Sequence, residues 1–517
     1  MKIHRSIETG LGTPSAEPRP LQAAVRPPTP HRRVLLVDLN RFTSFPTLAV
    51  GILAASLRAG GFSVKVICPL ALDVPSAARE RQETLWDHVH RRVRLSDYHA
   101  VRMLRDAVRW PREWFAQRPR DVVLREMEKA FAEGVDAILL SAYLEHFHTV
   151  EGIGRLAARH GVPVLLGGPM FNLSGVADEW RNLPGLSAVV GGEVERHLPE
   201  LVESICSGKP LERFVGITFP DGRKTPAAPP LRRLDDCLFP DFDDFPWDRY
   251  PNRIVPVLTG RGCQWDKCTF CSDVISASGR TFRTRSLENV LVELQVQAER
   301  YNTTDFMFLD LKLNSNPEMF RGISRELRKY VRGAQWIGTV HVDQRKDNGV
   351  SRRDLFAAAA GGMRRISFGL ESGSQRLLDE MRKGCTVETN AEFVRNAHEA
   401  GLSVRCTMFK GYPGETAADM EATADFLEAN APYIERIRFN DFTVPLDTPI
   451  YQTLMEKAGG ATSLNLTSLD PRRAKALYDT REVDRAYRRA KARALATVFE
   501  INRKPLRETA RQFDGLM

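Results

Sequence analysis

Short apolar runs alternate with longer segments of mixed polarity along most of the chain. In the N-terminal half, the runs that read as strands are residues 34–37, 64–67, 137–140 and 164–166. Buried strands separated by helix-length segments are typical of a parallel sheet with helices on both faces. We therefore expect an α/β fold that begins with a doubly wound parallel sheet of the Rossmann type over residues 33–209.

The same alternation restarts after residue 250 and repeats six times. The candidate strands there are residues 254–258, 306–309, 336–340, 365–370, 404–409 and 436–439. A regular succession of strands and helices favours a (β/α) barrel over a second open sheet, and six repeats predict a partial (β/α)6 barrel of the TIM type. We expect this barrel over residues 251–452, with its functional residues at the carboxyl ends of the strands.

Two segments of the N-terminal half depart from this pattern. Residues 1–32 contain six prolines, which cannot sustain a helix or a central strand, so we expect a disordered arm there. Residues from about 73 to 131 carry more helical sequence than a sheet crossover needs, which predicts a helical insertion.

Two further segments flank the predicted barrel. Residues 210–250 are rich in Pro and Asp and predict a linker with a tight turn at Asp221-Gly222. The carboxylates within residues 240–246 are interpreted as part of an exposed turn rather than as a metal site. Residues 453–517 are basic and are expected to form a helical C-terminal region.

Composition and charge fit a large globular protein with more than one domain. The 517 residues include 74 basic and 65 acidic side chains, so the net charge of +9 is a small difference between large numbers. No RNP, KH or zinc-finger signature is present, and we do not expect a nucleic-acid partner. The longest apolar run, residues 48–57, is too short to span a bilayer, and residues 1–12 lack the apolar core of a signal peptide. We expect a cytoplasmic protein without a transmembrane segment.

Three of the eight cysteines stand within nine residues, directly after the first predicted barrel strand: Cys263, Cys268 and Cys271. Thiolates are the soft ligands that iron–sulfur clusters and zinc prefer. A structural zinc site needs a fourth ligand, for which Cys237 is the nearest spare thiol, so a zinc-stabilised binding protein remains an alternative. Three thiolates suit a four-iron cluster with one open iron, at which a further ligand can be bound and reduced.

This cysteine loop resembles the cluster loop of the radical S-adenosylmethionine (SAM) superfamily, in which three cysteines hold a [4Fe–4S] cluster and SAM chelates the fourth iron. Phe270 matches the aromatic residue that precedes the last cysteine in that family, and it is expected to contact SAM. Four residues separate Cys263 from Cys268, whereas the commonest family spacing has three. The resemblance implies that Cys263, Cys268 and Cys271 ligate a [4Fe–4S] cluster.

Polar residues at the ends of later predicted strands extend the resemblance to the rest of the SAM site. Asp310 stands where the family often has an acidic residue near the methionine amino group of SAM. Glu371 and Ser372 match the segment that contacts the ribose and methionine of SAM. Gly411 and Glu415 belong to a glycine-rich turn that lies beside adenine in the family.

The N-terminal half resembles the cobalamin-binding domain that precedes the barrel in one large subclass of this superfamily. The resemblance implies a cobalamin site bordered by Ser141, Gly167, Gly168 and Gly192. The D-x-H-x-x-G motif of classical cobalamin enzymes is absent, as it is in many members of the subclass. We interpret His146 and His148 as surface or capping groups rather than cobalt ligands.

The resemblance implies that the reduced cluster cleaves SAM and that the resulting radical removes hydrogen from an unactivated carbon. We expect a cobalamin-dependent C-methyltransferase acting on a natural product or peptide, with electrons from an external donor such as flavodoxin or ferredoxin. The alternative is a radical SAM enzyme that catalyses cyclisation, rearrangement or oxidation without methyl transfer. The sequence assigns no catalytic side chain beyond the cofactor ligands.

Overall fold

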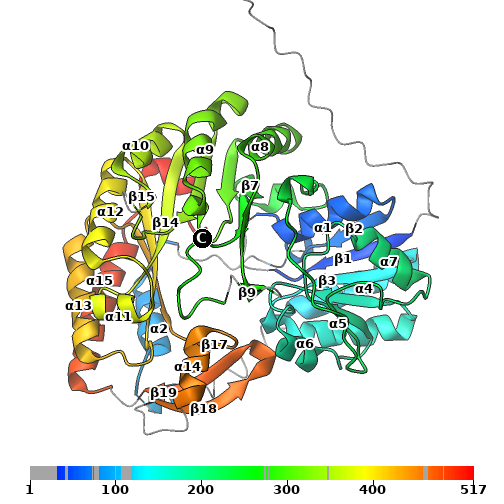
Figure 1. Cartoon of the computed structure of the whole chain (residues 1–517), viewed down its shortest axis with the longest axis horizontal. Helices are drawn as coiled ribbons and strands as arrows, with labels where there is room; N and C mark the ends of the chain where they lie inside the picture. Colours follow the sequence, from blue (N-terminus) through cyan, green and yellow to red (C-terminus); the bar gives the residue numbers. More distant parts are fainter. Residues whose placement is uncertain are drawn as a thin grey trace, which may run out of the picture.

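The computed structural model describes residues 32–516, except for 41–44, 73, 75–80, 99, 106, 108–117, 273–274, 277–278, 346–348, 458–463 and 481–482. Apart from Arg32, the predicted arm over residues 1–32 lies outside the described residues. Two α/β units lie side by side in Figure 1, with the N-terminal sheet in blue and cyan and the barrel in green to orange.

The N-terminal half contains a six-stranded sheet in the order β2-β1-β3-β4-β5-β6. Its strands are β1 (Arg33–Asp38), β2 (Ser63–Ile67), β3 (Ala137–Ser141), β4 (Val164–Gly167), β5 (Leu186–Val190) and β6 (Ile217–Thr218). The first five strands are parallel, and β6 pairs antiparallel with β5. The four predicted strands are confirmed, and β5 and β6 extend the sheet.

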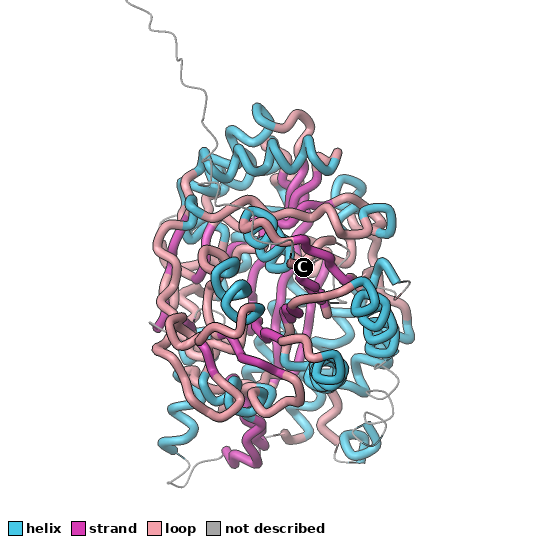
Figure 2. Tube along the Cα trace, turned by 90° about the vertical axis from the view of Figure 1, so that its right-hand side faces the viewer, coloured by secondary structure: helices cyan, strands magenta, loops and turns pink. Residues whose placement is uncertain are grey.

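Helices cover both faces of this sheet. Val34 and Leu36 of β1 pack in the core formed with α1 (Leu48–Ala59) and α7 (Leu198–Cys206). Leu35 and Val37 pack on the opposite face with α4 (Arg118–Glu133), α5 (Phe147–His160) and α6 (Ser174–Trp180), because successive side chains of a strand alternate. In Figure 2, which shows the molecule from the side of this unit, the strands lie between helices. The predicted doubly wound sheet is confirmed.

The second unit is the predicted barrel, with strands in the sequential order β7-β12-β13-β14-β15-β16. The strands are β7 (Ile254–Val257), β12 (Asp305–Phe308), β13 (Gln335–Val340), β14 (Met363–Glu371), β15 (Ser403–Lys410) and β16 (Arg436–Asp441). The helices are α8 (Leu287–Tyr301), α9 (Pro317–Tyr330), α10 (Arg352–Ala360), α11 (Gln375–Glu380), α12 (Val387–Glu399) and α13 (Ala417–Asn430). All pairings are parallel, and β7 and β16 stand at the two edges, so the barrel is partial as predicted.

Part of the predicted insertion over residues 73–131 lies outside the described residues, and its described part contains helices with two different roles. The helix α4 is the crossover between β2 and β3, whereas α2 (Leu85–Arg94) lies against α15 (Arg485–Asn502) on the barrel (Figure 1). Arg94 donates from Nη2 to the carbonyl oxygen of Phe439 in β16 over 3.0 Å. Asp97 accepts from Lys410, over 2.8 Å, and from Lys491. The insertion is therefore an arm of the N-terminal unit that covers an edge strand of the barrel.

The predicted linker over residues 210–250 begins within the N-terminal unit, because β6 belongs to that sheet, and its later part packs between the two units. The predicted tight turn is present, since the Gly222 amide donates to the Phe219 carbonyl. The interpretation of residues 240–246 as an exposed turn was wrong: Asp241 is buried and pairs with Arg58 of α1 (2.9 Å) and Arg300 of α8 (3.1 Å). Asp241 therefore joins the two units.

The C-terminal region is helical in α15, as predicted, but it also contains strands. A three-stranded sheet consists of β17 (Val444–Pro445), β18 (Leu464–Asp470) and β19 (Lys475–Thr480). The helix α14 (Pro449–Lys457) lies between β17 and β18 in sequence. Its tip reaches the N-terminal unit, where the Arg472 carbonyl accepts from Trp180 Nε1 over 3.1 Å. This sheet forms a second connection between the two units (Figure 1). Of the helices in the described part of the chain, none is long and apolar enough to cross a membrane.

Candidate functional site

The cysteine loop begins directly after β7. Its first part, β8 (Gly260–Gly262), pairs antiparallel with β11 (Phe282–Thr284), and the short strands β9 (Ile275–Ser276) and β10 (Gly279–Arg280) lie between them in sequence. The Thr269 amide donates to the Met381 carbonyl over 3.0 Å, and the Ile450 amide donates to the Thr269 carbonyl over 2.9 Å. Backbone hydrogen bonds therefore fix the loop against the mouth of the barrel.

The donor set of this loop fits an iron–sulfur cluster. Cys263, Cys268 and Cys271 are half-buried. Among the described residues, no three His, Cys, Asp or Glu side chains converge on the position of a single metal ion. A four-iron cluster requires a wider spacing, because each of its three cysteines ligates a separate iron atom. Two buried lysines lie near the loop, with Lys312 close to Cys263 and Lys383 close to Cys268. Such cations favour thiolates over thiols.

Lys383 links the cysteine loop to Glu371, one of the predicted SAM residues. The Lys383 Nζ lies 2.9 Å from Glu371 Oε1 and 5.8 Å from the centre of the Phe270 ring. Burial alone would lower the pKa of Lys383, but the charges of Glu371 and Cys268 raise it above its ordinary value. Glu371 ends β14 with φ +61°, a conformation that residues other than glycine rarely adopt. The structure therefore brings Glu371 to the cluster loop as a member of a buried ion pair.

Asp310 has partners other than the one that the sequence suggested. Its carboxylate accepts from the Thr259 hydroxyl over 2.7 Å, from the Thr259 amide over 3.1 Å and from the Gly260 amide over 3.0 Å. Burial raises the pKa of Asp310 to about 6, although these hydrogen bonds oppose the shift. Asp310 thus holds the backbone that leads into the cysteine loop.

The segment after Glu371 is fixed by the start of α11 and by α13. The Ser372 hydroxyl lies 3.1 Å from the Thr423 hydroxyl, and Thr423 also accepts from the Gly373 amide. Ser374 is the N-cap of α11 and accepts from the Leu377 amide, as capping residues do. Ser372 is buried at the carboxyl end of β14, on the same side of the barrel as the cysteines.

The turn from Gly411 to Glu415 follows β15 and lies on that side as well. Gly411 has φ +81°, and its amide donates to Glu415 Oε2. The Tyr487 hydroxyl of α15 donates to the same carboxylate over 2.7 Å, and the Tyr478 hydroxyl of β19 donates to the Gly411 carbonyl. Burial raises the pKa of Glu415 to about 7. Thr416 then caps α13 through a capping box, which fixes the exit of the turn.

Two aromatic rings gather around that of Phe270, the residue before the third cysteine. The Phe270 ring centre lies 5.4 Å from that of Phe409 and 6.2 Å from that of Phe442, and the Phe409 and Phe442 centres are 4.8 Å apart. Each of these rings is partly exposed. The predicted SAM residues and this aromatic group thus gather around one loop at one end of the barrel.

The sequence reasoning missed a chain of charges beside Cys263. Lys312 Nζ lies 2.5 Å from Asp343 Oδ2, and both side chains are buried. Arg345 pairs with the same aspartate over 2.9 Å and donates to Gln264 Oε1 in the cysteine loop over 3.1 Å. Lys312 and Asp343 each follow a predicted barrel strand, and this position at the carboxyl end of a strand could have marked them as functional candidates.

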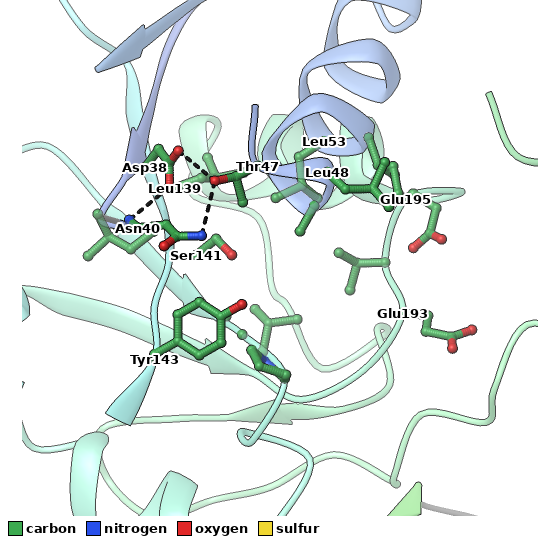
Figure 3. A pocket seen from close by; sticks show the side chains of 18 of the residues that line it. Asp38, Asn40, Thr47, Leu48, Leu53, Leu139, Ser141, Tyr143, Glu193 and Glu195 are labelled. Atoms are coloured by element: carbon green, nitrogen blue, oxygen red, sulfur yellow. Dashed lines mark hydrogen bonds between the residues drawn. The ribbon is translucent and has the colours of Figure 1, made fainter. Parts of the chain in front are cut away.

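A cavity of about 670 Å³ lies at the carboxyl ends of β1, β3, β4 and β5. Its size is typical of cofactor sites. All four residues predicted to border cobalamin line it: Ser141, Gly167, Gly168 and Gly192. Figure 3 shows Asp38, Asn40, Thr47 and Tyr143 on the same side of the cavity as Ser141, with Glu193 and Glu195 across from them. Leu258, Arg261 and Leu309 of the barrel complete the wall, so the cavity lies between the two units.

Of the three glycines predicted to border cobalamin, two are required by close packing. A Cβ at Gly168, where φ is +151°, would lie 2.2 Å from the Ala142 carbonyl oxygen. A Cβ at Gly192 would lie 2.5 Å from the Ala228 Cβ, whereas one at Gly167 would meet nothing closer than 3.6 Å. The backbone at Gly167 is therefore open to a ligand.

Acidic and hydroxyl groups give the cavity its polar side. Asp38 accepts from the Thr47 hydroxyl over 2.8 Å and from the Asn40 amide over 2.9 Å, and burial raises its pKa to about 6. No histidine is among the described residues that line the cavity. His146 accepts through Nδ1 from the Tyr143 amide over 3.2 Å, and His148 is exposed beside Glu151.

Arg261 connects this cavity to the cysteine loop, two residues before Cys263. Its guanidinium lies 2.5 Å from Glu195 and 3.3 Å from Glu193, both in the segment that follows β5. Arg283 of β11 also pairs with Glu193, over 2.7 Å. The cavity and the cysteine loop therefore share one set of ion pairs.

The arrangement is that of a two-unit protein in which a cysteine-bearing partial barrel faces a doubly wound sheet. Residues 257–427, from β7 into α13, match the model of the radical SAM superfamily. Together with the cysteine loop, this match identifies residues 257–427 as a radical SAM domain.

Two curated relatives are methyltransferases by name. An uncharacterised methyltransferase of Pyrococcus horikoshii is 30% identical over 269 residues, which cover 51% of this chain and 57% of the relative. The cytidylyl-2-hydroxyethylphosphonate methyltransferase of Streptomyces wedmorensis is 24% identical over 422 residues, which cover 76% of this chain and 74% of the relative. The chain thus spans little more than half the length of the Pyrococcus protein.

Two solved structures share the fold over most of the chain. The radical SAM methyltransferase TsrM of Kitasatospora setae has a TM-score of 0.63 at 18% identity, covering 90% of this chain and 89% of TsrM. The cobalamin-dependent SAM radical enzyme OxsB has a TM-score of 0.63 at 16% identity, covering 89% of this chain and 66% of OxsB. The succession of a doubly wound sheet and a partial barrel is therefore a fold that these enzymes also have.

Proposed function

We propose that this chain is a cobalamin-dependent radical SAM enzyme that methylates an unactivated carbon of a natural product or peptide. The observation that carries the proposal is the cavity between the two units. It is lined by the residues predicted to border cobalamin and, across from them, by Arg261, which leads into the cysteine loop. A cofactor in this cavity would lie next to the loop proposed to hold the cluster.

The known relatives support the same conclusion. Both curated relatives described above are named methyltransferases. The TsrM structure with the same fold contains cobalamin and a [4Fe–4S] cluster, and that of OxsB contains aqua-cobalamin and SAM.

When bound, the cluster supplies the electron that cleaves SAM, and cobalamin supplies the methyl group. Cys263, Cys268 and Cys271 would each hold one iron and leave the fourth iron to SAM. Lys383 and Lys312 balance the negative charge of the thiolates from two sides of the loop. Asp310 holds the entry of the loop in place through Thr259 and Gly260.

Phe270, Glu371, Ser372, Gly411 and Glu415 are proposed to form the SAM site at the mouth of the barrel. Phe270 offers its partly exposed ring, and the backbone of the Gly411 turn is held by Glu415. Asp310 would position this SAM site indirectly, by holding the backbone that leads into the cysteine loop. Ser141, Gly167, Gly168 and Gly192 are proposed to border the corrin.

The electrons are proposed to come from an external donor such as flavodoxin or ferredoxin, and we propose a cytoplasmic location. The substrate class is proposed to be a peptide or small natural product, bound between the two units where the aromatic group beside Cys271 is partly exposed.

The test is purification and reconstitution under anaerobic conditions, followed by measurement of iron, sulfide and corrinoid per chain. We expect about four irons and one corrinoid. One zinc without sulfide would overturn the radical SAM assignment in favour of a zinc-stabilised binding protein. A chain that holds both cofactors but yields cyclised, rearranged or oxidised product without a mass gain of one methyl group would overturn the methyl transfer alone.

A further inference from the structure

The segment of residues 507–516, named the wedge here, has exposed residues in its first part, but its last residues lie inside the molecule. The chain leaves α15 at Asn502, crosses the amino ends of the barrel strands and reaches the space between the two units, where Figure 1 marks the end of the chain. Phe513 is fully buried and Leu516 is 5% exposed.

Two buried arginines hold the backbone of the wedge. Arg365 in β14 donates from Nη1 to the carbonyl oxygens of Phe513 (3.0 Å) and Leu516 (3.3 Å). Arg436 in β16 pairs with Asp514 over 3.4 Å. Both arginine side chains are fully buried, and a guanidinium is costly to bury unless it is hydrogen-bonded. These contacts fix the wedge in one position.

Apolar side chains of the wedge fill the open interior of the partial barrel. Phe513 and Leu516 share one core with Ile254, Met307 and Ile337, which face inward from β7, β12 and β13. Phe45, from the segment before α1, packs in the same core. The wedge therefore contacts both units at once.

The tip of the wedge also reaches the cavity of the N-terminal unit. Gly515 and Leu516 line it together with Phe45, Leu258 and Leu309. Gly515 has φ +80°, a conformation that favours glycine, and this turn directs the chain toward the cavity. The cavity thus combines polar groups, such as Asp38 and Ser141, with apolar groups, among them Leu516 of the wedge.

We propose that the wedge is part of the corrinoid site and that Leu516 forms the apolar wall against which the macrocycle packs. The proposal rests on the proposed function. A corrin ring carries methyl groups along its edge and polar amide arms, so a cavity that offers both apolar and polar groups matches both parts. The wedge would set how far the macrocycle extends toward the barrel, and hence its distance from the cysteine loop.

The test compares Leu516→Trp with the matched control Arg511→Trp, which adds the same bulk at an exposed position of the wedge. Both variants and the unmodified chain are reconstituted with cluster and hydroxocobalamin, and corrinoid affinity, corrinoid absorption spectrum and iron content are measured. We expect L516W to bind hydroxocobalamin about tenfold or more weakly at unchanged iron content, because overfilling a packed site is unfavourable. We expect R511W to match the unmodified chain.

Leu516→Ala keeps the inference testable if L516W fails to fold. We expect this variant to bind hydroxocobalamin about threefold to tenfold more weakly, because it loses apolar contact area. Equal affinity and an equal spectrum in a folded L516W or L516A would overturn the inference while leaving the proposed function intact. An unmodified chain that takes up iron but no corrinoid would overturn the cobalamin part of the proposed function, and this inference with it.

Discussion

The mouth of the barrel and the cavity of the N-terminal sheet are constructed by different means. At the mouth, buried charges are paired with one another, as in Lys383 with Glu371 and Lys312 with Asp343. At the cavity, the backbone is closely packed at Gly168 and Gly192, and a few hydrogen-bonded side chains such as Asp38 border an open space. We infer that the mouth of the barrel suits charged ligands held in fixed positions, whereas the cavity of the N-terminal sheet suits a large ligand.

The largest effect is expected from removing a thiol of the cysteine loop. Cys268→Ala should abolish turnover and cluster iron but leave corrinoid uptake at the unmodified level, because Cys268 does not line the cavity. Iron, sulfide and corrinoid per chain measure this. Cys237→Ala is the control, since this thiol lies outside the loop and should be dispensable for iron binding. A C268A protein with full iron content would contradict the ligand assignment.

The next effect concerns the ion pairs that connect the two regions. Arg261→Met leaves Glu195 and Glu193 without this guanidinium, and the free energy of unfolding should fall by about 3 kcal/mol. Urea unfolding measures the change. In R261M the additional change Glu195→Gln should restore part of the loss by removing one uncompensated charge. If R261M unfolds like the unmodified chain, the two regions are not coupled through these residues.

Two neighbouring glycines test how closely the cavity is packed. Gly168→Ala should destabilise the fold by about 2 kcal/mol and weaken corrinoid uptake, because its Cβ would meet the Ala142 carbonyl and its φ is strained. Gly167→Ala, with no neighbour closer than 3.6 Å, should change stability by less than about 0.5 kcal/mol. Thermal unfolding and corrinoid titration compare the two, and equal behaviour would show that the packing argument does not hold.

The smallest effect is expected from the pH dependence of Glu415. Its pKa is about 7 in the folded chain and lower in the unfolded chain, so its contribution to stability is present at low pH and lost as pH rises through 7. The free energy of unfolding should fall by about 1 kcal/mol from this group between about pH 6 and 8.

Glu415→Gln should remove that part of the slope, because an amide oxygen can still accept from Gly411 and Tyr487. Chemical denaturation at several pH values measures it. An unchanged slope in E415Q would mean that other groups, such as Asp38 or Asp310, carry the pH dependence.

The sequence predicted those parts of the molecule whose signal is local. The six barrel strands are apolar runs, and the cysteines stand together in one loop, so both are visible in short windows. The partners of Asp241 are Arg58 and Arg300, which are far away in sequence, and a Pro- and Asp-rich stretch therefore resembled an exposed turn.

Two other differences have the same physical origin. The strands β18 and β19 adjoin a basic helix, so helix was expected there; β19 pairs with β17 as well as with β18. Asp310 follows an apolar strand, which marked it as functional, but its role in holding Thr259 depends on a contact between strand ends. Contacts between distant segments decide such roles, and no local pattern contains them.

The arm that carries α2 makes the two units interdependent. Residues 81–98 belong to the N-terminal half by sequence, yet Arg94 and Asp97 complete the far edge of the barrel. The wedge does the reverse, since it follows the barrel in sequence and lines the N-terminal cavity. The chain is therefore not modular: neither half can be excised, or exchanged for that of a relative, without exposing a surface that the other half normally covers.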